Sequence, residues 1–320
     1  MFGLNIELTT ICPLHCPQCY CSLLGGKNIP LEIAKEKINE AAEHKVKFVN
    51  LSGGETLCYP QLYDLISYIS EKNIKPSVAL SGWNFDETVL NKLEKSGIWG
   101  IFISLNGSTK EINSLSRNGY DYAINALEIL SKSNFKNTFI NWVMSSDNYF
   151  DFPNIIKIAE KYSISYIEII AIKPDSNNQL NSFPNSYQIL KVANEIKNYT
   201  GPVKILAETC FPQMQIALKY LGYNNIPSFF GCMAATKSYN ISVDGKYTPC
   251  RHLNIPEEFD NLDEYLNKSK VVRSIKDAEK NIQEPCSSCR FGNVCKPCLA
   301  INQKTKGKIY IGHNTCDLWK

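Results

Sequence analysis

Three cysteines close to the N-terminus could bring three thiolates to one metal centre. Cys12, Cys16 and Cys19 form a C-x3-C-x2-C pattern, and residues 4–10 before them alternate apolar and polar side chains as a strand does. Iron–sulfur clusters are usually held by four cysteines. A loop that offers only three would leave one iron open for a small molecule. Zinc ligation and a disulfide framework use similar spacings and remain alternatives for this loop taken alone.

The composition is that of an ordinary globular chain. It has 320 residues, 44% of them hydrophobic and 20% charged, which is enough for one large domain with a smaller one. A net charge of +3 is too small to indicate nucleic-acid binding. The N-terminus lacks the features of a signal peptide, and no apolar run reaches the ~20 residues that cross a bilayer. We therefore expect a cytoplasmic protein with no membrane partner, in which thirteen cysteines indicate metal binding rather than disulfides.

The elements that must position the cysteines alternate between strand and helix. Strands that are apolar on both faces and separated by helices indicate a parallel sheet covered by helices. Six such units are too few for a closed eight-fold barrel, so we expect an open or partial barrel. The predicted strands are 4–10, 46–51, 75–80, 98–105, 138–144 and 165–172, and the predicted helices are 30–44, 60–72, 86–96, 120–131, 153–161 and 186–197.

The C-terminal third contains a second set of ordered cysteines. A hairpin is predicted over 239–248, with Asp244-Gly245 as its turn. The spacing reads C-x12-G-x4-C, then C-x2-C-x5-C-x2-C, then a lone cysteine. A zinc ribbon made of the two C-x2-C pairs is the alternative, although five residues between pairs is short for a ribbon. The residues concerned are Cys232, Gly245, Cys250, Cys286, Cys289, Cys295, Cys298 and Cys316.

Together these motifs resemble the radical S-adenosylmethionine (SAM) enzymes that carry a C-terminal SPASM extension. The resemblance rests on the first cysteine loop, on Gly53-Gly54-Glu55 after the second predicted strand, and on the order of the C-terminal cysteines. It implies a partial (β/α)6 barrel over residues 1–200, a bridging region over 201–231 and a small cysteine-rich SPASM domain over 232–320.

The resemblance also implies how SAM is held. Cys12, Cys16 and Cys19 would hold a [4Fe-4S] cluster whose open iron chelates SAM. Contacts to SAM would come from Tyr20, Gly53, Gly54, Glu55, Ser104 and Arg117. Arg117 is equally well explained as a surface arginine. The chain departs from the family at Gln18, where an aromatic residue is usual, and at Asn106, where an aspartate is usual.

Two auxiliary [4Fe-4S] clusters are implied for the C-terminal region, which gives three clusters in all. The outer cluster would be held by Cys286, Cys289, Cys295 and Cys316. The inner cluster would be held by Cys232, Cys250 and Cys298, with Cys210 as a candidate fourth ligand. Relatives have three residues between the last cysteine pair, whereas this chain has two.

A few polar residues remain outside these sets. Cys58 follows the Gly-Gly-Glu segment and is a candidate catalytic residue, as a hydrogen donor or a cluster ligand, although a free cysteine is often only a small core residue. The same default applies to Cys21. His15 and His252 could tune a cluster through hydrogen bonds. Asn141 and Glu168 point from the last two predicted strands, and either could be structural.

The expected activity follows from the same resemblance. SPASM relatives mostly modify ribosomally made peptides, so we expect thioether or carbon–carbon crosslinking, or epimerisation, of a peptide. A dehydrogenase or cyclase acting on a small molecule is the alternative, and a non-catalytic zinc or iron–sulfur scaffold is the other. Arg251 and His252 after Cys250 argue against the sulfatase-maturing subclass. The implied partners are a peptide substrate, a separate leader-binding protein and an electron donor such as flavodoxin or ferredoxin.

Overall fold

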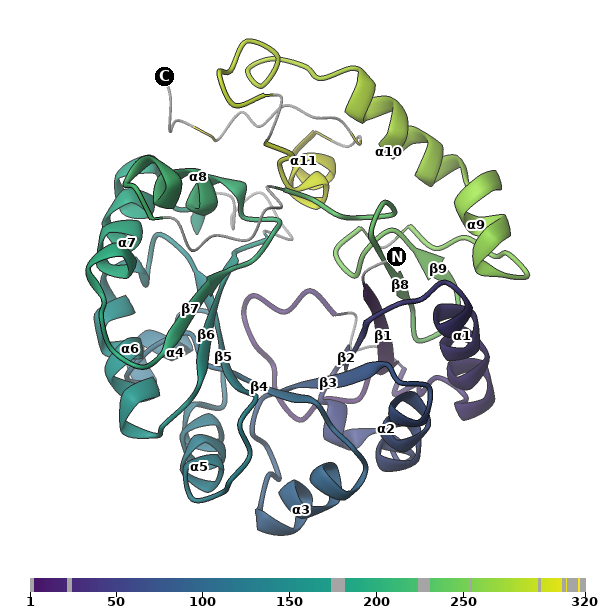
Figure 1. Cartoon of the computed structure of the whole chain (residues 1–320), viewed down its shortest axis with the longest axis horizontal. Coiled ribbons are helices and arrows are strands. Elements are labelled where there is room, and N and C mark those ends of the chain that lie inside the picture. Colours follow the sequence, from purple (N-terminus) through teal and green to yellow (C-terminus); the bar gives the residue numbers. More distant parts are fainter. Residues whose placement is uncertain are drawn as a thin grey trace.

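A computed structural model of the chain contains one large twisted sheet that does not close. It describes residues 3–21, 25–173, 182–223, 231–253, 255–292, 295–306, 309 and 316. Within these residues the sheet has nine strands in the order β7-β6-β5-β4-β3-β2-β1-β8-β9. Figure 1 shows the sheet curving around an interior, with the helices on its outer face. The prediction of an unclosed α/β barrel is therefore confirmed.

The predicted strand–helix alternation is also confirmed. All neighbouring pairs from β1 to β7 are parallel. The strands are β1 (Gly3–Thr9), β2 (Phe48–Gly53), β3 (Lys75–Leu80), β4 (Gly100–Ser104), β5 (Thr138–Met144), β6 (Tyr166–Ala171), β7 (Lys204–Ala207), β8 (Ser238–Ile241) and β9 (Tyr247–Thr248). The helices are α1 (Leu31–Glu43), η1 (Thr56–Cys58), α2 (Leu62–Glu71), α3 (Glu87–Lys95), α4 (Lys110–Ser114), α5 (Tyr120–Ser131), η2 (Tyr149–Asp151), α6 (Phe152–Lys161), α7 (Ser186–Asn198), α8 (Pro212–Tyr220), α9 (Leu262–Lys268), α10 (Lys270–Lys280) and α11 (Leu299–Lys306).

Side chains alternate between the two faces of each strand. In β1, Leu4, Ile6 and Leu8 are buried, whereas Asn5 and Glu7 between them keep some accessible surface. A strand's side chains point to opposite faces in turn. The apolar set therefore packs under the helices, and the polar set faces the interior of the barrel, where a substrate could be held.

The sheet continues beyond the six predicted strands. β7 pairs with β6, and β8 pairs in parallel with β1 at the opposite end. β8 and β9 form the predicted hairpin, and Gly245 in its turn has φ +77°. Both extensions come from residues after 200, so the C-terminal part of the chain joins the same sheet. The boundaries at residues 200 and 231 remain a prediction.

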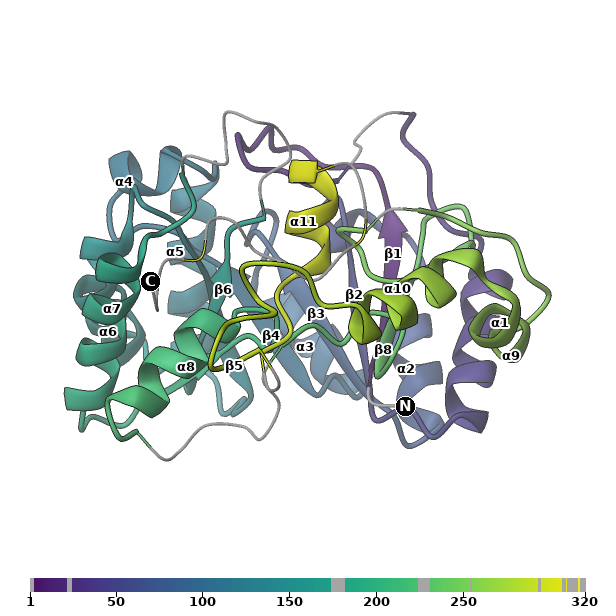
Figure 2. The same ribbon diagram turned by 90° about the horizontal axis from the view of Figure 1, so that it is seen from above.

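The C-terminal segment lies on the open side of the sheet. Figure 2 looks onto this side and shows α10 and α11 between α8 and α1. Cys232 donates its backbone N–H to Lys296 at 2.8 Å, which joins the segment to the chain leading into β8. Within the described residues, no helix is both long and apolar enough to pass through a membrane.

Asn106, which stands where an aspartate was expected, ties the carboxyl ends of β4 and β5 together. The side chain is 1% exposed. It donates to Ser116 Oγ at 2.9 Å and accepts from the backbone N–H of Val143 at 3.1 Å, and the backbone carbonyl of the same residue accepts from Trp142 Nε1. An asparagine can donate and accept at once, whereas an ionised aspartate only accepts.

We predict that Asn106→Ala lowers the free energy of unfolding by about 2 kcal/mol or more, because it leaves buried partners without hydrogen bonds. Chemical denaturation with circular dichroism measures the change. The matched control is Asn194→Ala, at an exposed position of α7. It should change the free energy of unfolding by less than about 0.5 kcal/mol. Equal effects of the two substitutions would contradict this role for Asn106.

Candidate active site inside the barrel

The first cysteine loop is held against the Gly-Gly-Glu segment by its backbone. Gly54 donates to Thr9 O at 2.7 Å, and Glu55 donates to Ile11 O at 2.8 Å. A Cβ at Gly53 would lie 2.5 Å from Thr9 O, and one at Gly54 would lie 2.3 Å from Ile11 O. Only glycine permits so close an approach. These contacts place the loop at the carboxyl ends of β1 and β2, as the sequence predicts.

A second segment holds the same loop from the other side. Gln18 donates its backbone N–H to Ser116 O at 3.2 Å, and Asn118 donates its side-chain amide to His15 O at 2.8 Å. The His15 side chain itself is exposed. The cysteine loop therefore rests between β2 and the connection that follows β4, which are the two places where SAM contacts were expected.

The three loop thiols act on one another electrostatically. Burial is the main cause that raises the pKa of Cys12 to about 11, and the charges of Glu55, Cys16 and Cys19 add to it. A hydrogen bond with the Cys21 side chain lowers the pKa of Cys19 to about 6, helped by the charge of Arg117. Among the described residues, no three His, Cys, Asp or Glu side chains stand close enough to hold a single metal ion.

Cys21 has a structural role that the sequence did not indicate. Its thiol donates to the carbonyl of Gly53 at 2.8 Å. This bond joins the end of the cysteine loop to the first glycine of the Gly-Gly-Glu segment. Cys58, the candidate catalytic residue, ends the short helix η1, and burial raises the pKa of its thiol. Its chemical role stays a prediction.

Glu55 is buried and its carboxylate is already hydrogen-bonded. The side chain is 1% exposed. It accepts from the backbone of Ser81 at 2.9 Å, from the Ser81 hydroxyl, and from the backbone of Leu57 at 3.3 Å. Burial raises the pKa of this carboxyl, while the bonds from Ser81 and the charge of Arg117 lower it. Through these hydrogen bonds Glu55 joins the carboxyl ends of β2 and β3. Its contact with SAM stays a prediction.

Buried polar atoms without partners mark the space beside the loop. Arg117 Nε and Gln18 Oε1 are buried and have no hydrogen-bond partner among the described residues. Because the charge of Arg117 acts on both Cys19 and Glu55, this arginine lies at the predicted site rather than away from it. Buried polar groups are normally satisfied. These atoms therefore fit a polar ligand such as SAM.

Tyr20 connects the cysteine loop to the C-terminal region. Its ring lies 4.4 Å from the ring of His252, and the guanidinium of Arg251 lies 6.0 Å from its centroid. Arg251 also donates to Asn5 Oδ1 at 3.0 Å. The resemblance places Tyr20 near the adenine of SAM, and in the structure its described neighbours include these two residues that follow Cys250.

Ser104 belongs to a polar row that crosses three strands. The parallel register aligns Ser104 of β4 with Asn141 of β5, and Asn141 with Glu168 of β6. The three positions share one face of the sheet and keep some accessible surface. Asn141 Oδ1 is buried and has no partner among the described residues. The row lines the interior next to the predicted SAM contacts.

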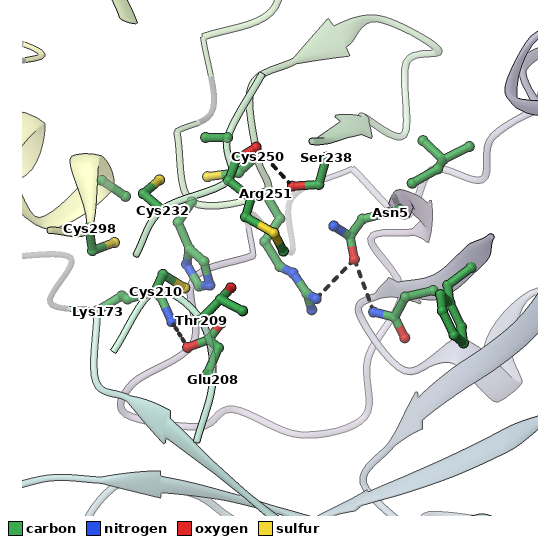
Figure 3. Close-up of a pocket in the computed structure, with 18 residues that line it drawn as sticks. Asn5, Lys173, Glu208, Thr209, Cys210, Cys232, Ser238, Cys250, Arg251 and Cys298 are labelled. Carbon is green, nitrogen blue, oxygen red and sulfur yellow. Dashed lines mark hydrogen bonds and ion pairs between the residues drawn. The ribbon is translucent and has the colours of Figure 1, made fainter. Parts of the chain in front are cut away.

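Four cysteines surround one end of a pocket of about 220 Å³. Cys210, Cys232, Cys250 and Cys298 line it, together with Lys173 and Glu208 (Figure 3). A hydrogen bond with Cys210 lowers the pKa of Cys298 to about 7. Burial raises the pKa of Cys232 to about 12, and the charges of Cys298 and Cys250 contribute. The structure thus brings Cys210, which follows β7, to the three cysteines predicted for the inner cluster.

A buried ion pair lies beside these thiols. Lys173 Nζ is 2.6 Å from Glu208 Oε2, and the lysine side chain is 4% exposed. Burial opposes the charged lysine, but the charges of Cys210 and Glu208 still raise its pKa. Neither residue was among the candidate site residues expected from the sequence. For Lys173 the available signal was its position directly after the predicted strand 165–172, which becomes β6, whereas β7, which Glu208 follows, has only four residues and gives no pattern.

The other four cysteines form a separate group in the C-terminal segment. Burial raises the pKa of Cys295, and the charges of Cys316, Cys286 and Cys289 raise it further. Cys289 donates its backbone N–H to Cys286 O at 3.3 Å, and a Cβ at Gly292 would lie 2.3 Å from that same carbonyl. The turn that carries the C-x2-C pair is therefore tight, and the grouping matches the predicted outer set.

Residues 6–159 match the family model described as the Radical SAM superfamily. This chain contains a radical SAM domain. The family implies a [4Fe-4S] cluster and SAM, and the radical SAM domain presents the three loop thiols, the close glycine contact and the unpartnered buried polar atoms that such groups require. Cys12, Cys16 and Cys19 are the thiols that would hold the cluster.

Known proteins resemble the chain over nearly its whole length. An AdoMet-dependent heme synthase from Methanosarcina barkeri is 23% identical over 92% of this chain and 90% of its own length. A PqqA peptide cyclase from Rhodopseudomonas palustris is 24% identical over 90% of this chain and 79% of its own. Streptococcus suis SuiB, solved with its precursor peptide SuiA, has a TM-score of 0.78 at 17% identity over 99% of this chain and 76% of its own. Several further sequence matches cover about half of this chain and less than half of the relative.

We predict that Gly54→Ala weakens SAM binding at least tenfold, because its Cβ would displace the backbone at Ile11 and shift the cysteine loop. Equilibrium binding of SAM to the reconstituted protein measures this. Gly3→Ala is the matched control, since a Cβ there meets only Phe48 O at 3.8 Å. Unchanged SAM affinity in the Gly54 variant would show that the loop does not depend on this contact.

Proposed function

We propose that the chain is a radical SAM/SPASM enzyme that modifies a ribosomally synthesised peptide by crosslinking, thioether formation or epimerisation. The observation that carries the proposal is the grouping of cysteines into three sets. One set lies against Gly53 and Gly54 at the carboxyl end of the barrel, and two lie in the C-terminal region on its open side. When bound, the reduced cluster of the first set supplies the electron that cleaves SAM to a 5′-deoxyadenosyl radical.

The residues of the chain hold the clusters and position SAM. Cys12, Cys16 and Cys19 hold the SAM cluster. The backbone at Gly53 and Gly54, together with Ser104 and Arg117, positions SAM. Cys286, Cys289, Cys295 and Cys316 hold the outer auxiliary cluster, and Cys210, Cys232, Cys250 and Cys298 hold the inner one. The contact of Cys210 with Cys298 supports Cys210 as the fourth inner ligand.

A peptide substrate is supported by two of the similar proteins. The name of the PqqA peptide cyclase states a peptide substrate, and SuiB was solved with a precursor peptide. In this proposal a separate protein binds the leader segment, and a flavodoxin or ferredoxin supplies electrons. The second candidate is a small-molecule substrate, which is favoured by the heme synthase match over 90% of that relative's length.

Removal of the three loop thiols tests the SAM site. In Cys12→Ala/Cys16→Ala/Cys19→Ala, the iron content after anaerobic reconstitution should fall from about twelve to about eight atoms per chain, because one of three four-iron clusters is lost. Release of 5′-deoxyadenosine should fall below detection. Continued SAM cleavage by this variant would overturn the proposed function.

The substrate class is tested by mass spectrometry of the product. A short peptide encoded beside the gene is incubated with the enzyme, SAM and reductant. Loss of two hydrogens indicates a crosslink or an oxidation. A product whose mass is unchanged in ordinary water but that takes up deuterium from heavy water indicates epimerisation. If the mass of the adjacent peptide does not change, but the enzyme consumes SAM when a porphyrin is supplied, the small-molecule substrate replaces the peptide in the proposal.

Lys173 should raise the reduction potential of the inner cluster, because a buried positive charge beside Cys210 stabilises the added electron. We predict that Lys173→Met lowers the midpoint potential measured by EPR-monitored titration. Lys173→Met/Glu208→Gln is the control, since it removes the pair without changing net charge, and its shift should be clearly smaller. A potential that stays unchanged in Lys173→Met would exclude this role.

A further inference from the structure

We propose that Glu168 and Asn141 form a subsite for a primary ammonium group of the substrate, such as the side chain of a lysine. This inference rests on the proposed function, because it assigns part of the substrate to the interior of the same barrel. It names the chemistry of that part. The group is a cation with several N–H donors, and the subsite supplies acceptors to it.

The two side chains lie next to each other on one face of the sheet. Asn141 and Glu168 are directly paired in the parallel register of β5 and β6. The buried neighbours of Glu168 along its strand, Ile167 and Ile169, are 0% exposed, whereas Glu168 and Asn141 both keep accessible surface. The pair therefore points to the interior, where the charges of Glu208, Arg251 and Lys173 act on Glu168.

Among the residues that the structure describes, neither acceptor has a donor. Asn141 Oδ1 is buried and has no hydrogen-bond partner among the described residues. Across the same residues, the structure contains no hydrogen bond or ion pair to the carboxylate of Glu168, whereas Lys173 is paired with Glu208 at 2.6 Å and Arg251 is bonded to Asn5. Buried acceptors are normally paired. Two adjacent unpaired acceptors thus call for a ligand that donates.

The carboxylate of Glu168 itself favours a cation over an anion. The other charges that act on it are the carboxylate of Glu208 and the cations Arg251 and Lys173, and both cations already have partners in the structure. Burial raises the pKa of Glu168 to about 7; Glu208 adds to this, while Arg251 and Lys173 lower it. A bound ammonium would replace the lost hydration of the carboxylate, whereas a substrate carboxylate would be repelled.

The subsite also lies beside the predicted chemistry. Asn141 is paired on its other side with Ser104, which is a predicted SAM contact. Glu168 is acted on by Glu208 and Lys173, which line the four-cysteine pocket (Figure 3). A lysine side chain anchored at Glu168 would therefore place its carbon chain between the SAM site and the inner cysteines.

The experiment compares two matched probes on the reconstituted protein with SAM bound. Nα-acetyl-L-lysine methylamide and Nα-acetyl-L-norleucine methylamide differ by the terminal ammonium. Anaerobic calorimetry should show at least tenfold tighter binding of the lysine probe at pH 8. That preference should decline as pH falls through 7, because Glu168 then gains a proton. Glycine methylamide offers an ammonium group without the side chain and should bind no better than the norleucine probe. If glycine methylamide bound as tightly as the lysine probe, the site would be one for a chain terminus and the lysine subsite would be overturned.

Two variants locate the effect. Glu168→Gln should abolish the preference for the lysine probe and its pH dependence, and Asn141→Ala should reduce the preference several-fold. Glu195→Gln, on an exposed position of α7, is the matched control and should keep both. If the intact protein binds the two probes equally, or if Glu168→Gln retains the preference, the inference is wrong.

The outcome can be separated from failure of the proposed function. Slow cleavage of SAM by the dithionite-reduced intact protein needs no substrate and no ammonium subsite, so release of 5′-deoxyadenosine is measured on the intact protein beside the binding of the two probes. Intact SAM cleavage with no lysine preference would overturn only this inference. Absence of SAM cleavage in the intact protein would overturn the proposed function itself.

Discussion

Two glycines let one backbone lie directly on another, and the predicted SAM site depends on that contact. Gly53 and Gly54 bring the end of β2 against Thr9 and Ile11, so close that a Cβ at either glycine would overlap a carbonyl oxygen. The hydrogen bond from the Cys21 thiol to Gly53 O joins the other end of the loop to the same glycine. A long loop without regular structure is thereby fixed at both ends. The charges of the three thiols and of Arg117 then act on one another or on Glu55 at this end of the barrel.

The open sheet explains how the C-terminal cysteines reach the barrel. Because the edge strands β7 and β9 do not meet, the segment with α10 and α11 can lie across the gap. Cys210 follows one edge of the sheet, and Cys232 and Cys250 flank the hairpin at the other. Cys298 begins the turn into α11 between them. The inner cysteine group therefore lies across the opening of the sheet. A closed sheet would leave no room for the segment that carries Cys298.

Charge balance inside the barrel sets what can enter it. The fold pairs Lys173 with Glu208 and ties Arg251 to Asn5 and Tyr20. Within the described part of the chain, Glu168 and Asn141 have no donors. A buried acceptor such as Asn141 Oδ1 is costly to leave unpaired unless a ligand satisfies it. Such groups are expected at sites of function rather than of stability. The interior is thus prepared for a donor that the chain does not itself supply.

The sequence by itself determined the local features of this protein. The spacing of Cys12, Cys16 and Cys19, the glycines at 53 and 54, the Asp-Gly hairpin and the six strand–helix units all depend on residues close together in the chain, so periodicity and turn chemistry reveal them. Only the tertiary structure decided which distant residues meet. β7 has four residues, too few for a pattern, yet it carries Glu208 and Cys210 to Lys173 and Cys298. The pairing of Glu168 with Asn141 depends on strand register, and the position of Arg251 depends on where the hairpin packs. Such contacts follow from the packing of the whole chain, and no local stretch of residues encodes them.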